Sequence, residues 1–195
     1  HVIDGAISNA KLMRDQVGMI ISGDLLNQII SASFAARDFS VPFLGVYGAC
    51  STMAESLALA AIAVDGGYCD NVVAATGSHF ASAERQYRYP LELGCTRPPQ
   101  SQWTVTGAGA ALVAREGDGI RIGSATLGKV MDFGITDVNN MGAAMAPAAA
   151  DTILAHFRAT REEPEAYDLI VTGDLGALGS RILKDLTWEK GVDIS

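Results

Sequence analysis

The 195-residue sequence is poor in charge, and the charge that it has is unbalanced. Charged residues make up 18% of the chain, with 14 basic and 22 acidic side chains and a formal net charge of -8. Nucleic-acid-binding surfaces need a face rich in lysine and arginine, so this balance argues against nucleic-acid binding. Hydrophobic residues, at 49%, are too frequent for a disordered chain.

Long hydrophobic runs are also missing. The longest uninterrupted apolar stretch runs from Leu57 to Val64, whereas a membrane-spanning helix needs about 20 such residues. Alanine and glycine are abundant instead, with 30 and 21 residues, or about a quarter of the chain. Small side chains let neighbouring elements approach closely. The composition therefore predicts a compact α/β protein.

Cysteine is scarce, with three residues in all: Cys50, Cys69 and Cys95. None forms a C-x-x-C pair, so the sequence supports neither a zinc site nor a thioredoxin-type motif. Their odd number and wide spacing favour a reducing compartment over a disulfide framework. We expect no metal site and no cofactor. The chain begins within a helical pattern and ends on the approach to a strand, which we interpret as a piece of a longer protein.

Short apolar runs alternate with helical patterns along the first part of the chain. This order predicts a mostly parallel sheet with right-handed crossovers. The D-G dipeptide in Glu116-Gly-Asp-Gly119 predicts a tight hairpin between the last two strands, which adds an antiparallel partner. We expect strands at 17–21, 41–47, 71–76, 103–115 and 120–127, and helices at 25–36 and 52–64, the second ending at Gly66-Gly67.

The pattern then restarts, with helices predicted at 145–161 and 181–190 around a strand at 168–172. Pro147 is expected in the first turn of its helix, where proline is tolerated. The heptads Met19–Leu25 and Leu169–Leu175 share one order: three apolar residues, a hydroxyl, Gly, Asp and Leu. Such a repeat is expected of a fold with two similar halves, although strand–Gly–Asp turns are also common in unrelated α/β proteins. Asp24 and Asp174, near the ends of the repeats, are expected to cap the following helices or to face a site.

Cys50 is the strongest candidate for chemistry. It lies between a predicted strand and a predicted helix, in Tyr47-Gly-Ala-Cys-Ser-Thr52. The N–H groups at a helix N-terminus favour an anion, so a thiol placed there tends to be nucleophilic. A nucleophile also needs a base or an oxyanion hole, and a buried, inert cysteine is the alternative interpretation.

Other candidates follow the third predicted strand. Strand ends of open α/β sheets bind ligands, so Ser78 and His79 are candidate binding residues, although a histidine that packs in a loop is about as common. Arg85 and Arg88 lie in a loop with two tyrosines, a composition suited to a small aromatic acid. An ordinary surface loop or a subunit contact is the alternative. Thr106 and Gly107 lie within the predicted strand at 103–115, where Gly107 and Gly109 would let the backbone approach a pocket.

Taken together, these motifs resemble the thiolase superfamily and, within it, a family of sporulation proteins from spore-forming bacteria. The segments that carry the resemblance are Ser22–Gln28, Tyr47–Thr52, Ser78–His79 with Ala83–Pro90, Thr104–Gly109, Gly134–Asp137, Met145–Thr152 and Thr172–Leu175. The resemblance implies a layered α-β-α fold of two similar halves. Residues 1–128 would form the first half, without its start, and residues 129–195 the beginning of a truncated second half.

The resemblance also implies a function. The protein would bind dipicolinic acid, a pyridine dicarboxylate, alone or as its calcium chelate, and support its uptake into the developing spore. It would be peripheral to the spore inner membrane and act with membrane proteins of the same operon, and it could form a homodimer. Cys50 would occupy the nucleophile position. The implied ligand-binding residues are Cys50, Ser78, His79, Arg85, Arg88, Thr106, Gly107 and Asp174.

Catalysis is the open question. Thiolase-type condensation also uses a histidine and a further polar residue from C-terminal motifs, which this chain does not contain. We therefore expect a non-catalytic binding protein on a thiolase-like scaffold. A cysteine-dependent acyltransferase and an assembly protein that docks other proteins are the alternatives.

Overall fold

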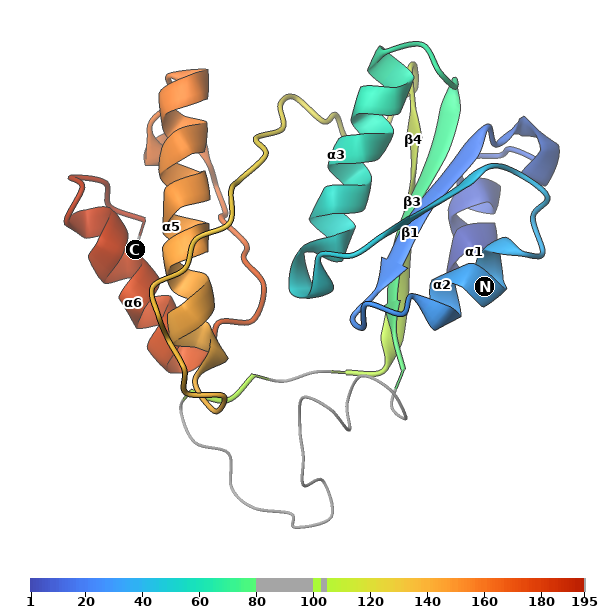
Figure 1. Ribbon diagram of the computed structural model, residues 1–195. Coiled ribbons are helices and arrows are strands. Elements are labelled where there is room, and N and C mark those ends of the chain that lie inside the picture. Colours follow the sequence, from blue (N-terminus) through green and yellow to red (C-terminus); the bar gives the residue numbers. More distant parts are fainter. Residues whose placement is uncertain (80–99, 103–104, 195) are drawn as a thin grey trace. The chain divides into compact units, whose positions relative to one another are not determined.

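The computed structural model describes residues 1–79, 100–102 and 105–194, and these residues fall into two compact units. The first unit comprises residues 1–79 and 105–122, and the second comprises residues 100–102 and 123–194. Figure 1 shows an open sheet with its helices in the first unit and a pair of long helices in the second. The two units are described separately below.

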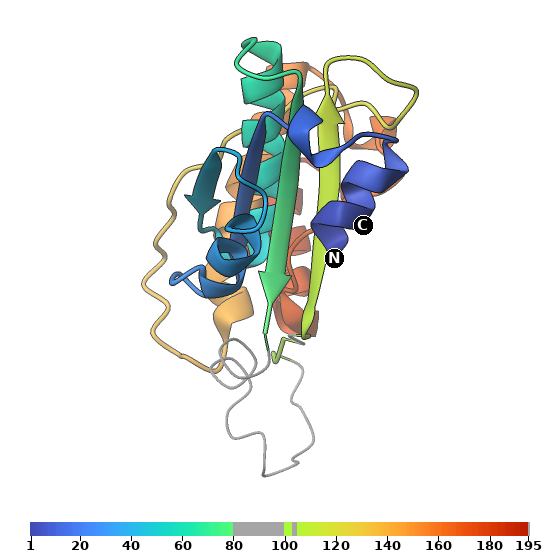
Figure 2. The same cartoon turned by 90° about the vertical axis from the view of Figure 1, so that its right-hand side faces the viewer.

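The first unit is built on a four-stranded sheet with the strand order β2-β1-β3-β4. The strands are β1 (Met19–Asp24), β2 (Phe43–Val46), β3 (Asn71–Ser78) and β4 (Gly107–Ala114). Strand β1 pairs in parallel with both β2 and β3, and β4 pairs antiparallel with β3. The prediction of a mostly parallel sheet is confirmed, but the predicted hairpin is wrong: the antiparallel strand β4 pairs with β3, and residues 120–127 form no strand. Figure 2 shows the strands side by side.

Helices cover both faces of this sheet because successive side chains of a strand point to opposite faces. Ile20 and Val73 face one core with helix α1 (Val2–Asn9), on the side that also carries α2 (Ile30–Ala36) (Figure 1). Their neighbours Ile21 and Val72 face the other core, under α3 (Thr52–Asp65). All four side chains are at most 1% exposed. The first unit is therefore the layered α-β-α arrangement that the sequence predicts.

Helix α3 packs closely on the sheet through small side chains. Ala60 is fully buried, and the buried Ser56 donates a hydrogen bond of 3.3 Å from Oγ to the carbonyl oxygen of Ala75 on β3. The helix ends at Gly66, and Gly67 has φ +75°, a conformation that glycine adopts without strain. The Gly-Gly stop signal in the sequence thus has the expected effect.

The second unit contains the helices α5 (Met141–Thr160) and α6 (Gly176–Trp188), which begin at the same end and share an apolar core. Gly142 and Gly179 lie in close contact: a Cβ on Gly179 would lie 2.7 Å from the Cα of Gly142. Single turns of 3₁₀-helix lie at Arg14–Gln16, Ala49–Ser51 and Pro164–Ala166. In the described residues, no helix combines the length and apolar character needed to cross a membrane.

Several predicted elements are wrong. Residues 120–127 and 168–172 are not strands; their side chains are largely exposed, and no neighbouring strand in the described residues supplies hydrogen bonds to them. Helix α5 begins at Met141, so Pro147 lies in its second turn rather than its first. Helix α2 begins five residues later than predicted and α6 five residues earlier.

Candidate functional site

Cys50 lies on a tight elbow between β2 and α3, as predicted, and its side chain is exposed. The fully buried Thr52 holds the elbow, because its Oγ accepts the N–H of Gly48 at 3.2 Å and donates to the carbonyl oxygen of Ala49 at 2.8 Å. Ser51 Oγ donates to the carbonyl oxygen of Gly48 at 2.8 Å. These bonds fix the backbone that presents Cys50 at the start of the helix.

The elbow is crowded enough to require glycine at two positions. A Cβ on Gly23, in β1, would lie 2.0 Å from the carbonyl oxygen of Val46, and one on Gly48 would lie 2.4 Å from Ser51 Oγ. Ala49 has φ +48°, which is unfavourable for a residue with a Cβ. Strained backbone of this kind persists where the surrounding packing imposes it, often at functional sites.

A carboxylate lies beside the elbow. Glu55, in the first turn of α3, places Oε2 2.8 Å from the position that a Cβ on Gly48 would occupy. This oxygen is buried and has no hydrogen-bond partner in the described part of the chain. A carboxylate is favourable near a helix N-terminus, but it disfavours a second negative charge close by. The elbow therefore has the position of a nucleophile but not a purely anion-stabilising environment.

A small hollow lies at the carboxyl ends of β1 and β3, where ligands bind in open α/β sheets. It is open to solvent and encloses about 250 Å³, counting the space shared with solvent. Its lining residues are Asp24, Leu25, Leu26, Gln28, Ile30, Ser31, Ser78 and His79. The structure thus brings together Ser78 and His79, two of the predicted binding residues.

Asp24 also lines the hollow, and the sequence predicts one of its two structural features. It is 6% exposed, and its Oδ2 accepts the backbone N–H of Ala32 in α2 at 3.2 Å, so the predicted helix cap is confirmed. Its Oδ1 is buried and has no partner in the described residues. The Gly-Asp turn signals the cap in the sequence, but nothing there shows that the second oxygen is left for the hollow.

Thr106 and Gly107 lie near the hollow because β4 runs antiparallel to β3. Gly107 is the register partner of Ser78, and Ser78 Oγ donates to the carbonyl oxygen of Val105. A Cβ on Gly107 or Gly109 would meet no described atom within 4 Å, so the predicted approach of this backbone to a pocket stays a prediction.

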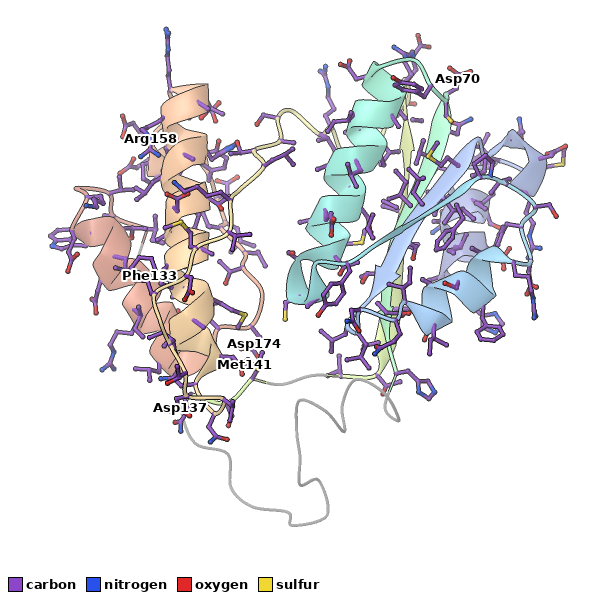
Figure 3. The ribbon with its side chains drawn as sticks, in the orientation of Figure 1. Asp70, Phe133, Asp137, Met141, Arg158 and Asp174 are labelled. Carbon is purple, nitrogen blue, oxygen red and sulfur yellow. The ribbon has the colours of Figure 1, made fainter. Side chains whose placement is uncertain are left out.

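The remaining predicted residues fall elsewhere. Cys50 follows β2 at the same sheet edge but does not line the hollow. Arg85 and Arg88 lie outside the described residues. Asp174 belongs to the second unit, where its Oδ1 accepts the N–H of Gly176 at 2.9 Å at the start of α6. Figure 3 labels Asp174 and Met141 at the end of this unit where its two helices begin.

The second unit also contains a chain of hydrogen bonds that the sequence did not predict. His156 Nδ1 lies 2.8 Å from Thr126 Oγ1, and His156 Nε2 lies 2.7 Å from the hydroxyl of Tyr167. Tyr167 donates its hydroxyl proton to Glu162. The hydrogen bond to this carboxylate, and then burial, raise the pKa of Tyr167 above its usual value of 10.0. His156 thus links α5 to two other segments of the second unit.

Within residues 1–79, 100–102 and 105–194, no group of three or more His, Cys, Asp or Glu side chains is placed to hold a metal ion. The hollow offers one carboxylate, one imidazole and hydroxyl or amide groups, which suit hydrogen bonding to a small polar molecule.

Solved structures with the same fold define the class of protein. The 3-oxoacyl-[acyl-carrier-protein] synthase III of Aquifex aeolicus aligns with 97% of this chain and 63% of its own length, at a TM-score of 0.64 and 14% identity. OleA of Xanthomonas campestris aligns with 98% of this chain and 64% of its own, at a TM-score of 0.65 and 16% identity. At such low identity these similarities establish the fold, which is thiolase-like, as the sequence motifs predict.

The family follows from sequence. The family model for Stage V sporulation protein AD matches residues 1–195. Stage V sporulation protein AD of Bacillus subtilis is 47% identical over 192 residues, which cover 98% of this chain and 57% of that protein. The chain belongs to the Stage V sporulation protein AD family and spans little more than half the length of this relative.

Proposed function

We propose that this chain is the part of a sporulation protein that binds dipicolinic acid and supports its uptake, with calcium, into the developing spore. The hollow at the carboxyl ends of β1 and β3 carries the proposal, because it gathers Ser78 and His79 where open α/β sheets bind ligands. Membership of a sporulation family supports the biological setting. Arg85 and Arg88 supply the positive charge that a dicarboxylate needs.

The scaffold acts as a binding protein rather than an enzyme in this proposal. Cys50 has the placement of a nucleophile on its elbow, and the buried Glu55 Oε2 lies beside Gly48 of the same elbow. His79 lines the hollow, whereas Cys50 does not.

The protein would be peripheral to the spore inner membrane, with membrane proteins of the same operon as partners, and would form a homodimer. Its ligand would be dipicolinate, free or as the calcium chelate, without a further cofactor. The net charge of -8 argues against nucleic acid as a partner.

Calorimetric titration of the chain with dipicolinate, with calcium and with a chelator in its place, tests the proposal. We expect saturable binding, and benzene-1,3-dicarboxylate, which lacks the ring nitrogen, should bind more weakly. Arg85→Ala or Arg88→Ala should weaken binding by about 1–3 kcal/mol if the guanidinium makes a charge-assisted bond to the ligand. Arg121→Ala, at an exposed arginine of the first unit, is the matched control and should bind normally. Absence of saturable heat would overturn the proposal.

A cysteine-dependent acyltransferase is the second candidate, and the exposed elbow of Cys50 is the observation that favours it. Incubation with acyl-CoA followed by intact-mass spectrometry distinguishes the two. An added acyl mass that is absent in Cys50→Ser would establish acyl transfer to the thiol, whereas an unmodified mass supports the binding role.

A further inference from the structure

Residues 25–36 cover the hollow, and Asp24 holds them in place with only one of its two carboxylate oxygens hydrogen-bonded in the described residues. Asp24 is 6% exposed, and one oxygen of its carboxylate anchors α2 through the N–H of Ala32. The other oxygen is buried and accepts no hydrogen bond from the described residues. A buried acceptor without a donor is costly, and more so when it is charged. Closure over the hollow therefore carries a penalty that water would relieve if the cover lifted.

The cover also contains a strained backbone position. Ile29, just before α2, has φ +44° and ψ +37°, which is the left-handed region. A β-branched side chain is a genuine outlier there. Ile29 is held by packing, because its Cδ1 lies 2.3 Å from the position that a Cβ on Gly45 would occupy. Strain of this kind persists only while neighbouring contacts impose it.

Helix α2 is a weak anchor for this strained loop. It has seven residues, and only Ala32 and Ala36 are buried, so it places little apolar area in the core. Ile30 and Phe34, one turn apart, are 57% and 60% exposed. Segments with few buried apolar contacts open locally at lower free energy than the core around them. At its start, the cover is held by the N–H of Leu25, which donates to the carbonyl oxygen of Gly77 at 3.0 Å.

We propose that residues 25–36, which we name the strap, lift and close over the hollow in the native protein. The strap pivots at its first residue, where the N–H of Leu25 bonds to the carbonyl oxygen of Gly77. Asp24 is the positioning residue, because its Oδ2 accepts the N–H of Ala32 when the strap is closed. Lifting the strap hydrates Asp24 Oδ1 and releases Ile29 from its left-handed conformation. Closure is then favoured when a donor group enters the hollow, whatever molecule carries that group.

Two buried alanines provide a matched test on the full chain. Ala32 is 6% exposed in the strap and Ala60 is fully buried in α3, away from the hollow. A thiol reagent should label Ala32→Cys at least about ten times faster than Ala60→Cys under native conditions, because local opening exposes only the strap. Mass spectrometry of the peptides separates these sites from the native cysteines.

Amide hydrogen exchange on the unsubstituted protein gives the same comparison without a mutation. The amides of Ala32 and Ser33 should exchange at least about ten times faster than those of Ile20 and Ile21 in β1. This measurement decides the question if either cysteine variant fails to fold. Equal exchange rates in α2 and β1, or equal labelling of the two cysteine variants, would overturn the proposal that the strap lifts.

Discussion

Two segments with nearly the same sequence pattern adopt different structures in this molecule. In Met19–Leu25 the apolar residues form β1, and Ile20 and Ile21 are 0% and 1% exposed. In Leu169–Leu175 the same pattern forms no strand, and Leu169 and Val171 are 76% and 77% exposed. Each segment contains an aspartate, Asp24 or Asp174, that bonds to the start of the following helix.

The difference shows which part of the pattern is local and which part depends on neighbours. An aspartate can cap a helix with a single hydrogen bond to nearby backbone, so both copies do it. A strand needs partners for its N–H and C=O groups. Strand β1 has β2 on one side and β3 on the other, whereas the later heptad has no strand partner in the described residues.

The largest effect is expected from substitutions at Ile21 and Val171, the third apolar residue of each heptad. Ile21→Ala should lower the free energy of unfolding by about 2–5 kcal/mol, because it leaves a cavity between the sheet and α3. Val171→Ala, its counterpart in the later heptad, should change stability by less than about 0.5 kcal/mol, because the side chain is exposed. Denaturant unfolding of the two variants measures the difference, and similar losses would show that Val171 is buried in solution.

The next effect tests whether the second unit has a close-packed core of its own. A Cβ on Gly142 would lie 2.0 Å from the carbonyl oxygen of Leu175, so Gly142→Ala should separate α5 and α6 and cost about 1–3 kcal/mol. Gly5→Ala is the control: Gly5 lies in α1 with no atom within 4 Å of a Cβ, and alanine there should stabilise the helix by about 0.5–1 kcal/mol. Thermal unfolding followed by circular dichroism compares them, and a Gly142→Ala protein of normal stability would contradict the close contact.

A smaller effect compares the two caps. Asp24→Ala should destabilise the protein by about 1 kcal/mol, because the Ala32 N–H loses its acceptor. Asp174→Ala should cost about half as much, since its partner Gly176 stands at an exposed helix start where water replaces the carboxylate. Urea midpoints of the two variants give the ranking, and a larger loss at Asp174 would reverse it.

The smallest effect is pH-dependent and belongs to the second unit. The hydrogen bond to Glu162 raises the pKa of Tyr167 above 10.0 in the folded protein, so the neutral phenol is favoured by folding. Its contribution to stability is therefore complete below pH 10.0 and is lost as the pH rises through the folded-state pKa. Tyr167→Phe should lower stability slightly at pH 8 and flatten the fall in stability above pH 10. Identical stability profiles for the two proteins from pH 8 to 11 would exclude this role.

Much of the first unit could be predicted from the sequence because its signals are local. Apolar runs that end in Gly or Asp gave β1 and β3, and the Gly-Gly stop gave the end of α3. The elbow at Cys50 and the position of Ser78 and His79 at a strand end also followed from the order of elements.

What could not be predicted depends on contacts between distant residues. Pro147 lies in the second turn of α5 because the helix starts at Met141, where Asn140 Oδ1 accepts the N–H of Ala143. The unpartnered oxygen of Asp24 results from how α2 is placed, which no local pattern encodes. The segments 120–127 and 168–172 were wrongly predicted as strands, because propensity and periodicity do not reveal whether a pairing strand is present.

The most direct test of the binding role is a titration with dipicolinate followed by backbone amide chemical shifts. The proposed site predicts saturable shifts at Asp24, Ser78 and His79, with a common dissociation constant that matches calorimetry. The absence of saturable shifts at these three residues, up to the highest soluble dipicolinate concentration, would contradict the assignment of the hollow as the dipicolinate site.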